Sequence, residues 1–312
     1  MKNFVIACIL LLSVISTSAQ DAELKLNLEK NKIYRFKSIS EQNVSQTVNG
    51  VEQTTTSLSN TAFSIKMVDA TADFIIAEVR FDTIITKTNA MGKISDVSSA
   101  VEGNIASEEA ADVMSFIMNR MSKNALYVKM DGTGKVIDIV NHKMMSDIIL
   151  KDTASIKGQM APILKTQIKN TVSKEALVTM VESFTYNLPG KPVQKGDQWN
   201  ISAPLNAGGM TLDIATSYKM ETLKDNEAGV TAESVIKTGA NAKPMEYSGA
   251  KISYDGLGGM GKSQLTINTL TGLVIENSAK STITGNLNVS AQGMNMQIPM
   301  NIESTSTTSF VQ

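Results

Sequence analysis

Polar and apolar residues alternate along much of this 312-residue chain, and this alternation restricts its fold more than any other feature. Clear examples between Lys32 and Thr88 are residues 62–68 (AFSIKMV) and 74–82 (FIIAEVRFD). A two-residue period places successive side chains on opposite faces of a strand, and Asn49-Gly50 and residues 69–73 supply turns. Many polar positions are Thr or Ser, which suits a solvent-facing side of a sheet. The region therefore predicts an antiparallel β-meander.

Helical periodicity replaces the alternation in two places. From Glu108 to Lys123 apolar residues recur at helical spacing after an acidic first turn, which predicts a helix. Residues 143–186 form the main helical segment. Within it, we expect Pro162 in the first turn of one helix and Ser173 at the N-cap of another.

Strands are expected in the rest of the chain. Residues 125–140 predict a hairpin with its turn at residues 131–134, and everything after Pro189 again favours strand. The last hairpin alternates from Met294 to Glu303. Because proline cannot donate to a β-ladder, Pro299 on the polar side of this hairpin predicts an edge strand.

The two β-rich regions resemble each other in sequence. The matched segments are 28–36 with 193–201, 66–67 with 219–220, 77–78 with 232–233, and 134–138 with 272–276. Four matches in the same order predict an internal duplication. The predicted fold class is α+β, mainly antiparallel β: a duplicated β-meander, as a curved sheet or partial barrel, with helical insertions in the middle of the chain. One continuous sheet and two packed sheets both remain open.

The first residues have the pattern of a secretory signal peptide. Lys2 precedes an apolar run from Phe4 to Leu12, and small residues follow up to Ala19. The run is too short to cross a bilayer, and no later stretch is apolar enough to do so. We therefore expect cleavage near Ala19, a periplasmic or extracellular protein, and a mature chain without its single cysteine, Cys8.

The predicted organisation has four parts. Residues 1–19 are the signal peptide, residues 20–142 the first meander with a helix near 108–123, residues 143–187 the helical insertion, and residues 188–312 the second meander. The chain carries 29 basic and 30 acidic residues, so its net charge offers no basis for nucleic-acid binding. No transmembrane segment is expected in the mature chain.

One segment matches two nucleotide-binding patterns at once. Residues 256–263 (GLGGMGKS) satisfy both G-x-x-x-x-G-K-[ST] and G-x-G-x-x-G. A phosphate-binding loop must open a helix, because helix N-terminal N–H groups bind the phosphate. The following residues, 264–272, favour a strand and a turn instead. We therefore interpret the glycines as a flexible loop between strands.

Other candidates for catalysis or metal binding lack partners in the sequence. His142 is the only histidine, and no G-x-S-x-G or H-E-x-x-H pattern accompanies it. Glu108, Glu109 and Asp112 suit the first turn of a helix, and the Asp131 turn has too few carboxylates for calcium. We predict no catalytic, cofactor-binding or metal-ligating residues and no cofactor. A hydrolase built on carboxylates remains a minor alternative, because 30 acidic residues cannot exclude it.

Two triplets, Asp82-Thr83-Ile84 and Asp152-Thr153-Ala154, resemble the O-glycosylation acceptor of Bacteroidota. An intact mass of the native protein would test modification at Thr83 or Thr153.

The segment 188–199 (LPGKPVQKGDQW) carries a family resemblance. Its L-P-x-K-P-V-x-x-G-D-x-W pattern resembles an uncharacterised domain-of-unknown-function family of secreted Bacteroidota proteins of about this length. The resemblance implies an envelope location and no assigned activity. By their own chemistry the prolines stiffen the entry to a strand, Gly196-Asp197 makes a turn, and Trp199 packs in the core.

The 18 methionines allow two interpretations. They fill a core, or they line a hydrophobic cavity for apolar ligands. A curved sheet crossed by helices resembles lipoprotein-carrier proteins at the level of fold only. The leading hypothesis is a secreted, non-enzymatic envelope protein that binds an apolar or amphiphilic ligand. The alternative is a structural or interaction module that binds an envelope protein or glycan through edge strands.

Overall fold

The computed structural model describes residues 21–159, 161–207, 210–240, 242, 244–247, 250–291 and 294–311. The predicted signal peptide with Cys8 lies outside these residues, as does Met160.

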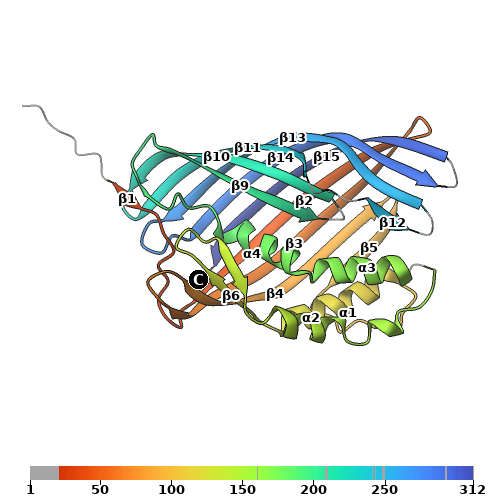
Figure 1. Cartoon of the computed structure of the whole chain (residues 1–312), viewed down its shortest axis with the longest axis horizontal. Coiled ribbons are helices and arrows are strands. Elements are labelled where there is room, and N and C mark those ends of the chain that lie inside the picture. The colour runs from red at the N-terminus through yellow and green to blue at the C-terminus, as the bar shows by residue number, and fades with distance from the viewer. Residues whose placement is uncertain are drawn as a thin grey trace, which may run out of the picture.

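One continuous antiparallel sheet of thirteen strands dominates the fold (Figure 1). Its main path runs β7-β6-β4-β3-β2-β15-β14-β13-β11-β10-β9, with β5 beside β4 and β12 beside β13. The first half contains β2 (Ile33–Val48), β3 (Val51–Ala70), β4 (Ile75–Ala90), β5 (Lys93–Ser98), β6 (Leu126–Met130) and β7 (Val136–Ile139). The second half contains β9 (Gln198–Ala207), β10 (Met210–Lys224), β11 (Glu227–Thr238), β12 (Met245–Tyr247), β13 (Ala250–Asn268), β14 (Val274–Ala291) and β15 (Met294–Val311). The predicted fold class is confirmed, and the sheet is continuous rather than split in two.

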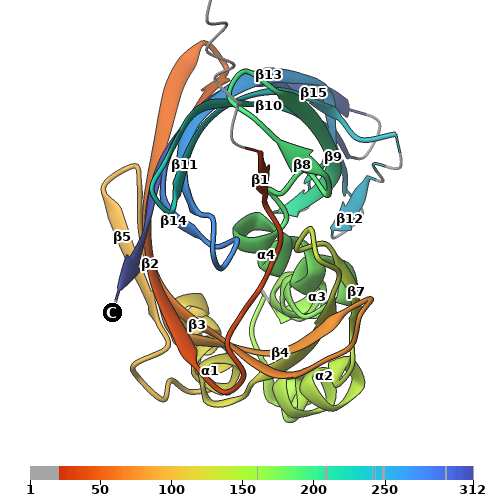
Figure 2. The ribbon, with the colours of Figure 1, turned by 90° about the vertical axis from the view of Figure 1, so that its left-hand side faces the viewer.

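The sheet is strongly curved and open, and the helices lie on its concave side (Figure 2). They are α1 (Ala110–Lys123), α2 (His142–Leu150), a 3₁₀ turn (Thr153–Ser155), α3 (Ala161–Thr171) and α4 (Lys174–Thr185). The helix predicted from Glu108 begins two residues later, and the predicted cap is confirmed because Ser173 Oγ accepts from the N–H of Ala176 at 3.2 Å. Pro162 is the second residue of α3, as expected.

The main core lies between the helices and one end of the sheet. The ring of Phe63 on β3 lies 5.0 Å from Phe36 on β2 and 3.9 Å from Phe184 on α4, measured between centroids. Trp199 is buried, as predicted, and stacks on Tyr218 at 5.3 Å, while its Nε1 donates to the carbonyl of Asn187 at 3.0 Å. Aromatic contacts therefore hold both halves of the sheet to α4 and its C-terminal extension.

β15 joins the two halves, because it pairs with β14 on one side and β2 on the other. The predicted edge strand at Pro299 is therefore wrong. Pro299 pairs with Asn286 of β14, whereas pairing with β2 begins only at Met300, opposite Gln46. The missing N–H of proline thus lies just beyond the ladder with β2, and no hydrogen bond to that strand is lost.

The strand register agrees with the predicted duplication. Ile33 pairs with Lys66 between β2 and β3, and the matched residues Gln198 and Lys219 pair between β9 and β10. The hairpins β6–β7 and β13–β14 also correspond: Gly134 and Gly272, which the sequence match equates, both have a positive φ. The match of 77–78 with 232–233 is shifted, because Lys66 pairs with Glu78 but Lys219 pairs with Thr231, two residues before Glu233. The strand order and two of the matched sites therefore agree between the two meanders.

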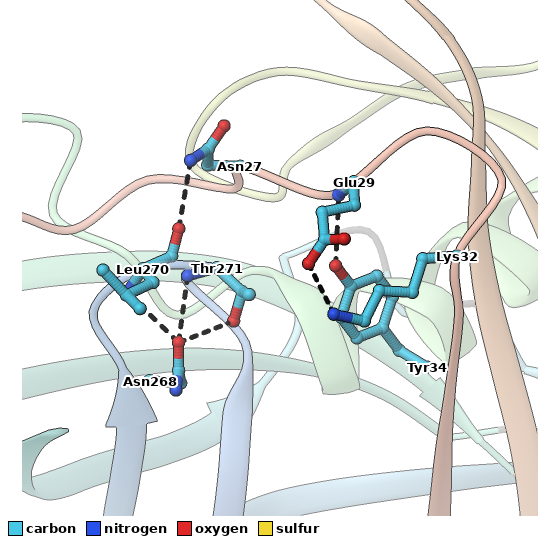
Figure 3. Close-up of polar contacts among 7 residues, drawn as sticks. All are labelled: Asn27, Glu29, Lys32, Tyr34, Asn268, Leu270 and Thr271. Carbon is cyan, nitrogen blue, oxygen red and sulfur yellow. Dashed lines mark hydrogen bonds and ion pairs between the residues drawn. The ribbon is translucent and has the colours of Figure 1, made fainter. Parts of the chain in front are cut away.

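Residues 24–31 form an extended strap across one end of the curved sheet (Figure 2). Leu24, Leu26 and Leu28 are buried in the main core. The N–H of Leu26 donates to Gly132 O at 2.8 Å, and the N–H of Asn27 donates to Thr271 O at 2.9 Å. Figure 3 shows the Asn27 side chain donating to Leu270 O as well. The strap thus ties together the two equivalent hairpin turns.

Before the strap, β1 (Ala22–Glu23) pairs with β8 (Pro192–Val193) in a separate two-stranded sheet. Where the strap meets β2, the hydroxyl of Tyr34 accepts from the N–H of Glu29 at 3.1 Å, and the Glu29 carboxylate pairs with Lys32 (Figure 3). Both ends of the strap are therefore fixed to strands.

The glycine-rich segment 256–263 lies inside β13, so the predicted loop is wrong. Gly256 has φ +58° and opens a bulge between Asp255 and Gly258. A Cβ at Gly259 would lie 2.2 Å from the carbonyl oxygen of Thr282 on β14. The glycines therefore permit a bulge and a close approach of strands. Strand continues to Asn268, as predicted, and no helix follows this segment.

Candidate ligand-binding site on the concave face

The concave face of the sheet can be assigned residue by residue from the strand register. Directly paired residues point to the same side, so the buried core residues fix the side for every long strand. We call these positions the inner face. They are even residues 34–48, odd residues 51–67, odd residues 75–81, even residues 84–90, odd residues 199–205, even residues 210–220, even residues 228–238, Ile252 and Tyr254, odd residues 257–267, odd residues 277–291 and even residues 294–310.

None of these described inner-face positions on the long strands holds Asp, Glu, Lys, Arg or His. On the short strand β5, Lys93 pairs with Ala90 and so lies on the same side, at the end of the sheet. The opposite face of the same strands carries the charges, among them Lys66, Glu78, Glu233, Lys262 and Glu303. Lys262, the lysine of the nucleotide-like motif, pairs across that outer face with Glu233 at 3.0 Å. A face built only to meet water would carry charges as the outer face does, so the inner face is not an ordinary solvated surface.

A belt of hydroxyl side chains crosses the inner face beyond the main core. Ser38 and Thr308 hydrogen-bond at 3.1 Å. Further pairs are Ser59 with Thr86 at 3.0 Å, Ser57 with Thr88 at 3.1 Å, and Thr216 with Ser234 at 2.8 Å. We expected hydroxyl groups on the solvent side of the sheet, but these lie on the same face as the core. Hydroxyls both donate and accept, so the belt can serve an uncharged polar group of either kind.

A second apolar cluster lies farther along the inner face, on the other side of the hydroxyl belt. We call it the distal cluster; its buried members are Leu212, Ile236, Leu257, Ile283, Met300 and Ile302. Leu257 reaches it because of the β13 bulge, and it packs against Gly285, where a Cβ would lie 2.7 Å from the Leu257 side chain. The inner face is therefore amphipathic along its length, with apolar ends and a hydroxyl belt between them.

A cavity of about 190 Å³ lies between the belt and the distal cluster. Its inner-face lining is Ile214, Ser234, Ile236, Gly261, Ser263, Ala279, Ser281, Ser304 and Ser306, and the outer-face residues Lys262, Lys280 and Thr305 complete it. The lining side chains are small on four adjacent strands, and this leaves the space. One side of the cavity is aliphatic and the other is hydroxyl-rich, which is the composition expected of a site for an amphiphile.

A smaller cleft of about 20 Å³ lies at the base of the inner face, next to α4. Phe36, Phe63 and Phe184 line it together with Asn277. The Asn277 Oδ1 atom is buried without a hydrogen-bond partner in the described residues. An unpaired buried acceptor is costly, so this cleft favours one small donor group.

Two inner-face tyrosines, Tyr218 and Tyr254, have raised pKa values because they are buried. Burial raises the pKa of Tyr218 to about 12, and its hydroxyl donates to Asn187 Oδ1 at 3.0 Å. Burial also raises the pKa of Tyr254, which packs against the distal cluster. The inner-face residues therefore remain uncharged at neutral pH.

The other sequence candidates have local structural roles. His142 begins α2, with Nε2 3.2 Å from the Val172 carbonyl oxygen. Asp112 accepts from the N–H of Asn104 at 3.1 Å, and Asp131 accepts from the N–H and hydroxyl of Thr133 within its turn. Glu109 is the N-cap residue of α1, and Glu108 precedes it. Within the described ranges, no group of three His, Cys, Asp or Glu residues is placed to hold a metal ion.

Some of the methionines fill the core, whereas Met91, Met144, Met260, Met294 and Met296 are exposed. Met121, Met130, Met145 and Met220 are almost completely buried in it, whereas Met300 belongs to the distal cluster. Thr83 and Thr153 are partly buried, and their glycosylation stays a prediction. Among the residues that the structure covers, no helix has the length and apolarity to cross a membrane.

The fold and this face define a class of protein: an open, strongly curved antiparallel sheet with helices on its concave side. The chain belongs to DUF6263, a family of unknown function whose model matches residues 72–274. This confirms the resemblance to a domain-of-unknown-function family. A search of curated proteins finds no match.

Solved structures extend the comparison to the fold alone. Lipovitellin, in a structure titled for its lipid–protein interactions, has 12% identity and a TM-score of 0.50 over 92% of this chain. The chain spans 26% of that lipovitellin chain. The translocator domain of the autotransporter NalP from Neisseria meningitidis has 7% identity and a TM-score of 0.23, covering 91% of this chain and 90% of that one. Pseudomonas aeruginosa OpdQ has 5% identity and a TM-score of 0.24, covering 90% and 100%.

Proposed function

We propose that this protein binds a neutral amphiphilic molecule on the inner face of its sheet. The observation that carries the proposal is the absence of charged residues from the described inner-face positions of the long strands, although the outer face of the same strands is charged. A neutral ligand is buried there at little electrostatic cost, whereas a charged one loses its hydration and finds no ion partner.

The three zones of the inner face suit the two parts of such a ligand. An alkyl or other apolar portion would contact the distal cluster, and a hydroxyl, ester or amide group would hydrogen-bond with the belt. Lipovitellin, which shares the fold at a TM-score of 0.50, is described by its title as interacting with lipid, and this supports the choice of an amphiphile. We further propose a role in binding rather than catalysis, in the periplasm or outside the cell.

Two adjacent residues of β14 provide the test. Ser281 lines the inner-face cavity, whereas Thr282 is exposed on the outer face opposite Glu303. We expect Ser281→Lys to weaken binding of the neutral fluorescent probe N-phenylnaphthylamine about tenfold or more, since it places a charge in the cavity. Thr282→Lys should bind the probe as the wild type does.

A second variant separates loss of binding from loss of folding. Ala279→Phe fills the cavity without adding charge and should also weaken probe binding, with circular dichroism and melting temperature as folding controls. Wild-type affinity in both folded variants would contradict the proposal. Native mass spectrometry of protein purified from its own source, followed by lipid extraction, identifies the ligand; a ligand-free mass and no probe binding would also contradict it.

The edges of the sheet give less support to the alternative of partner binding by strand addition. Among the described strands, β9 pairs on one side only, with β10, but it contains Pro204, which has no N–H to offer a partner strand. The opposite edge strand on the main path, β7, has only four residues. These are features that protect sheet edges against pairing.

A further inference from the structure

Exposed apolar side chains lie at the end of the sheet opposite the strap, where β2 is followed by β3, β4 by β5, and β14 by β15 (Figure 1). Met91 is in the turn between β4 and β5, Val51 and Met294 begin β3 and β15, and Ile94 is the second residue of β5. Val51 is 63% exposed, Met91 74%, Ile94 70% and Met294 70%. We call these four residues the rim residues. Single exposed apolar residues are common, but four at one rim are more than a face built only to meet water requires.

Turns at the other end are mostly polar. The β10–β11 turn is Asp225-Asn226, and the β6–β7 turn contains Asp131 and Thr133. At or next to the described turns of these three hairpins, the exposed large apolar residues are Leu270 in the β13–β14 turn and Ile137 on β7, which is 52% exposed. The rim residues are therefore more numerous and more exposed than those of the opposite end.

Met91 occupies a backbone position that does not favour methionine. Its φ is +50°, and the following Gly92 has φ +81°. The β2–β3 turn has the same geometry, with Asn49 at +52° and Gly50 at +78°. Asparagine and glycine are the residues that tolerate this left-handed conformation, so the fold itself favours Asn over Met at position 91. An exposed methionine in a conformation that disfavours it indicates selection for contact with something outside the chain.

We propose that the rim residues dock this protein onto the surface of a lipid bilayer. By the register, Ile94 lies on the outer face opposite Asn89, whereas Val51 and Met294 lie on the inner face, so the rim residues do not form one flat patch. A protein partner needs one continuous complementary surface, whereas fluid lipid fills the space around separate projections. The inner face also runs out to this rim through Val48, Val51 and Met294, with Lys93 of β5 on the same side next to Ile94. If the proposed ligand binding holds, docking here would align the binding face with the membrane that supplies or receives the ligand.

Flotation with large unilamellar vesicles tests the docking. We expect the wild type to float with phosphatidylethanolamine–phosphatidylglycerol vesicles and with pure phosphatidylcholine vesicles, and to stay bound in 0.5 M salt, because the contact is apolar. Met91→Asn combined with Ile94→Thr should reduce the floated fraction about fivefold or more. The matched control, Leu270→Asn at the opposite end, should float like the wild type.

Melting temperature distinguishes docking from a structural role for Met91. Met91→Asn should melt at the same or a higher temperature while it floats less, whereas a structural role would lower both. Failure of the wild type to float, or unchanged flotation of the double variant, would overturn the proposal. The proposal would also be overturned if light scattering showed that the wild type is a dimer, that Met91→Asn is a monomer, and that neither protein floats with vesicles. Binding of N-phenylnaphthylamine should be unchanged by Met91→Asn, so failure of docking and failure of ligand binding are told apart.

Discussion

Glu78 shows how single residues place charge on the outer face. Its side chain is 11% exposed and lies between Lys66, whose Nζ is 2.7 Å from Oε2, and Arg80, whose Nε is 2.5 Å from Oε1. The hydrogen bond from Lys66 is the main cause that lowers the pKa of Glu78, against desolvation, which raises it. The carboxylate is therefore held ionised and joins β3 to β4.

Glu78→Gln should destabilise the fold at neutral pH and have less effect in acid. A lowered folded-state pKa contributes stability that is fully present above the unfolded-state value, about 4.3, and is lost as the pH falls through the folded-state value. We expect a loss of about 1–2 kcal/mol in the free energy of unfolding at pH 7. Urea unfolding at pH 7 and pH 3 measures it; an equal loss at both pH values would contradict this explanation.

At the scale of elements, each of the two equivalent hairpins, β6–β7 and β13–β14, has a turn glycine that another segment approaches closely. A Cβ on Gly134 would lie 2.0 Å from the carbonyl oxygen of Thr185 at the end of α4. A Cβ on Gly272 would lie 2.1 Å from the carbonyl oxygen of Lys25 in the strap. Both glycines also have positive φ. In each of the two equivalent hairpins, the turn glycine therefore lets a segment outside the meander pack closely: the end of α4 at Gly134 and the strap at Gly272.

Gly134→Ala and Gly272→Ala should each destabilise the fold by about 2–4 kcal/mol, because backbone strain and a backbone clash add together. Gly196→Ala is the matched control: Gly196 has φ +95° but no atom within 4 Å of a Cβ, so strain alone should cost about 1 kcal/mol. Chemical denaturation gives the three values. Equal losses for all three variants would show that the close approaches do not matter.

Local patterns predicted the elements well wherever local physics determines them. Turn chemistry at Asn49-Gly50, the cap at Ser173 and the helical period before Lys123 all depend on a few neighbouring residues. The loop predicted at residues 256–263 was wrong because Gly259 lies against Thr282 and Ile283 of β14, a contact that no local pattern contains. The edge strand predicted from Pro299 was wrong for the same reason. A proline is tolerated there because pairing with β2 begins only at Met300, and the sequence around Pro299 does not show this.

The candidate site was only partly available from the sequence. In β15 every even residue from Met294 to Phe310 is uncharged, and this signal is visible without coordinates. The bulge between Asp255 and Gly258 changes the inward-facing residues of β13 from even to odd numbers. The register shift between Ala62 and Ser64 does the reverse in β4, where odd residues up to Phe81 and even residues from Ile84 face inward. The partition of charge across the whole sheet therefore emerges only once the register is known.

At the scale of the whole molecule, the long strands carry charged residues on the outer face and uncharged residues on the inner face, and this difference predicts the class of ligand. A monoacylglycerol should bind about tenfold or more tightly than the fatty acid of the same chain length at neutral pH, because the inner face has no cation for a carboxylate. Competition with N-phenylnaphthylamine measures both affinities. Ser281→Lys should shift the preference toward the fatty acid, and tighter binding of the carboxylate to the wild type would contradict the prediction.

The pairing of β15 with β2 also determines when this molecule can finish folding. Gln42 and Ser304 hydrogen-bond across that seam although 262 residues separate them in the chain. Hairpins within each meander form from near neighbours, but the seam closes a loop of most of the polypeptide, which is slow and entropically costly. One edge of β2 therefore has no partner during synthesis until the ribosome has released β15, so this sheet is completed only after translation of its last strand.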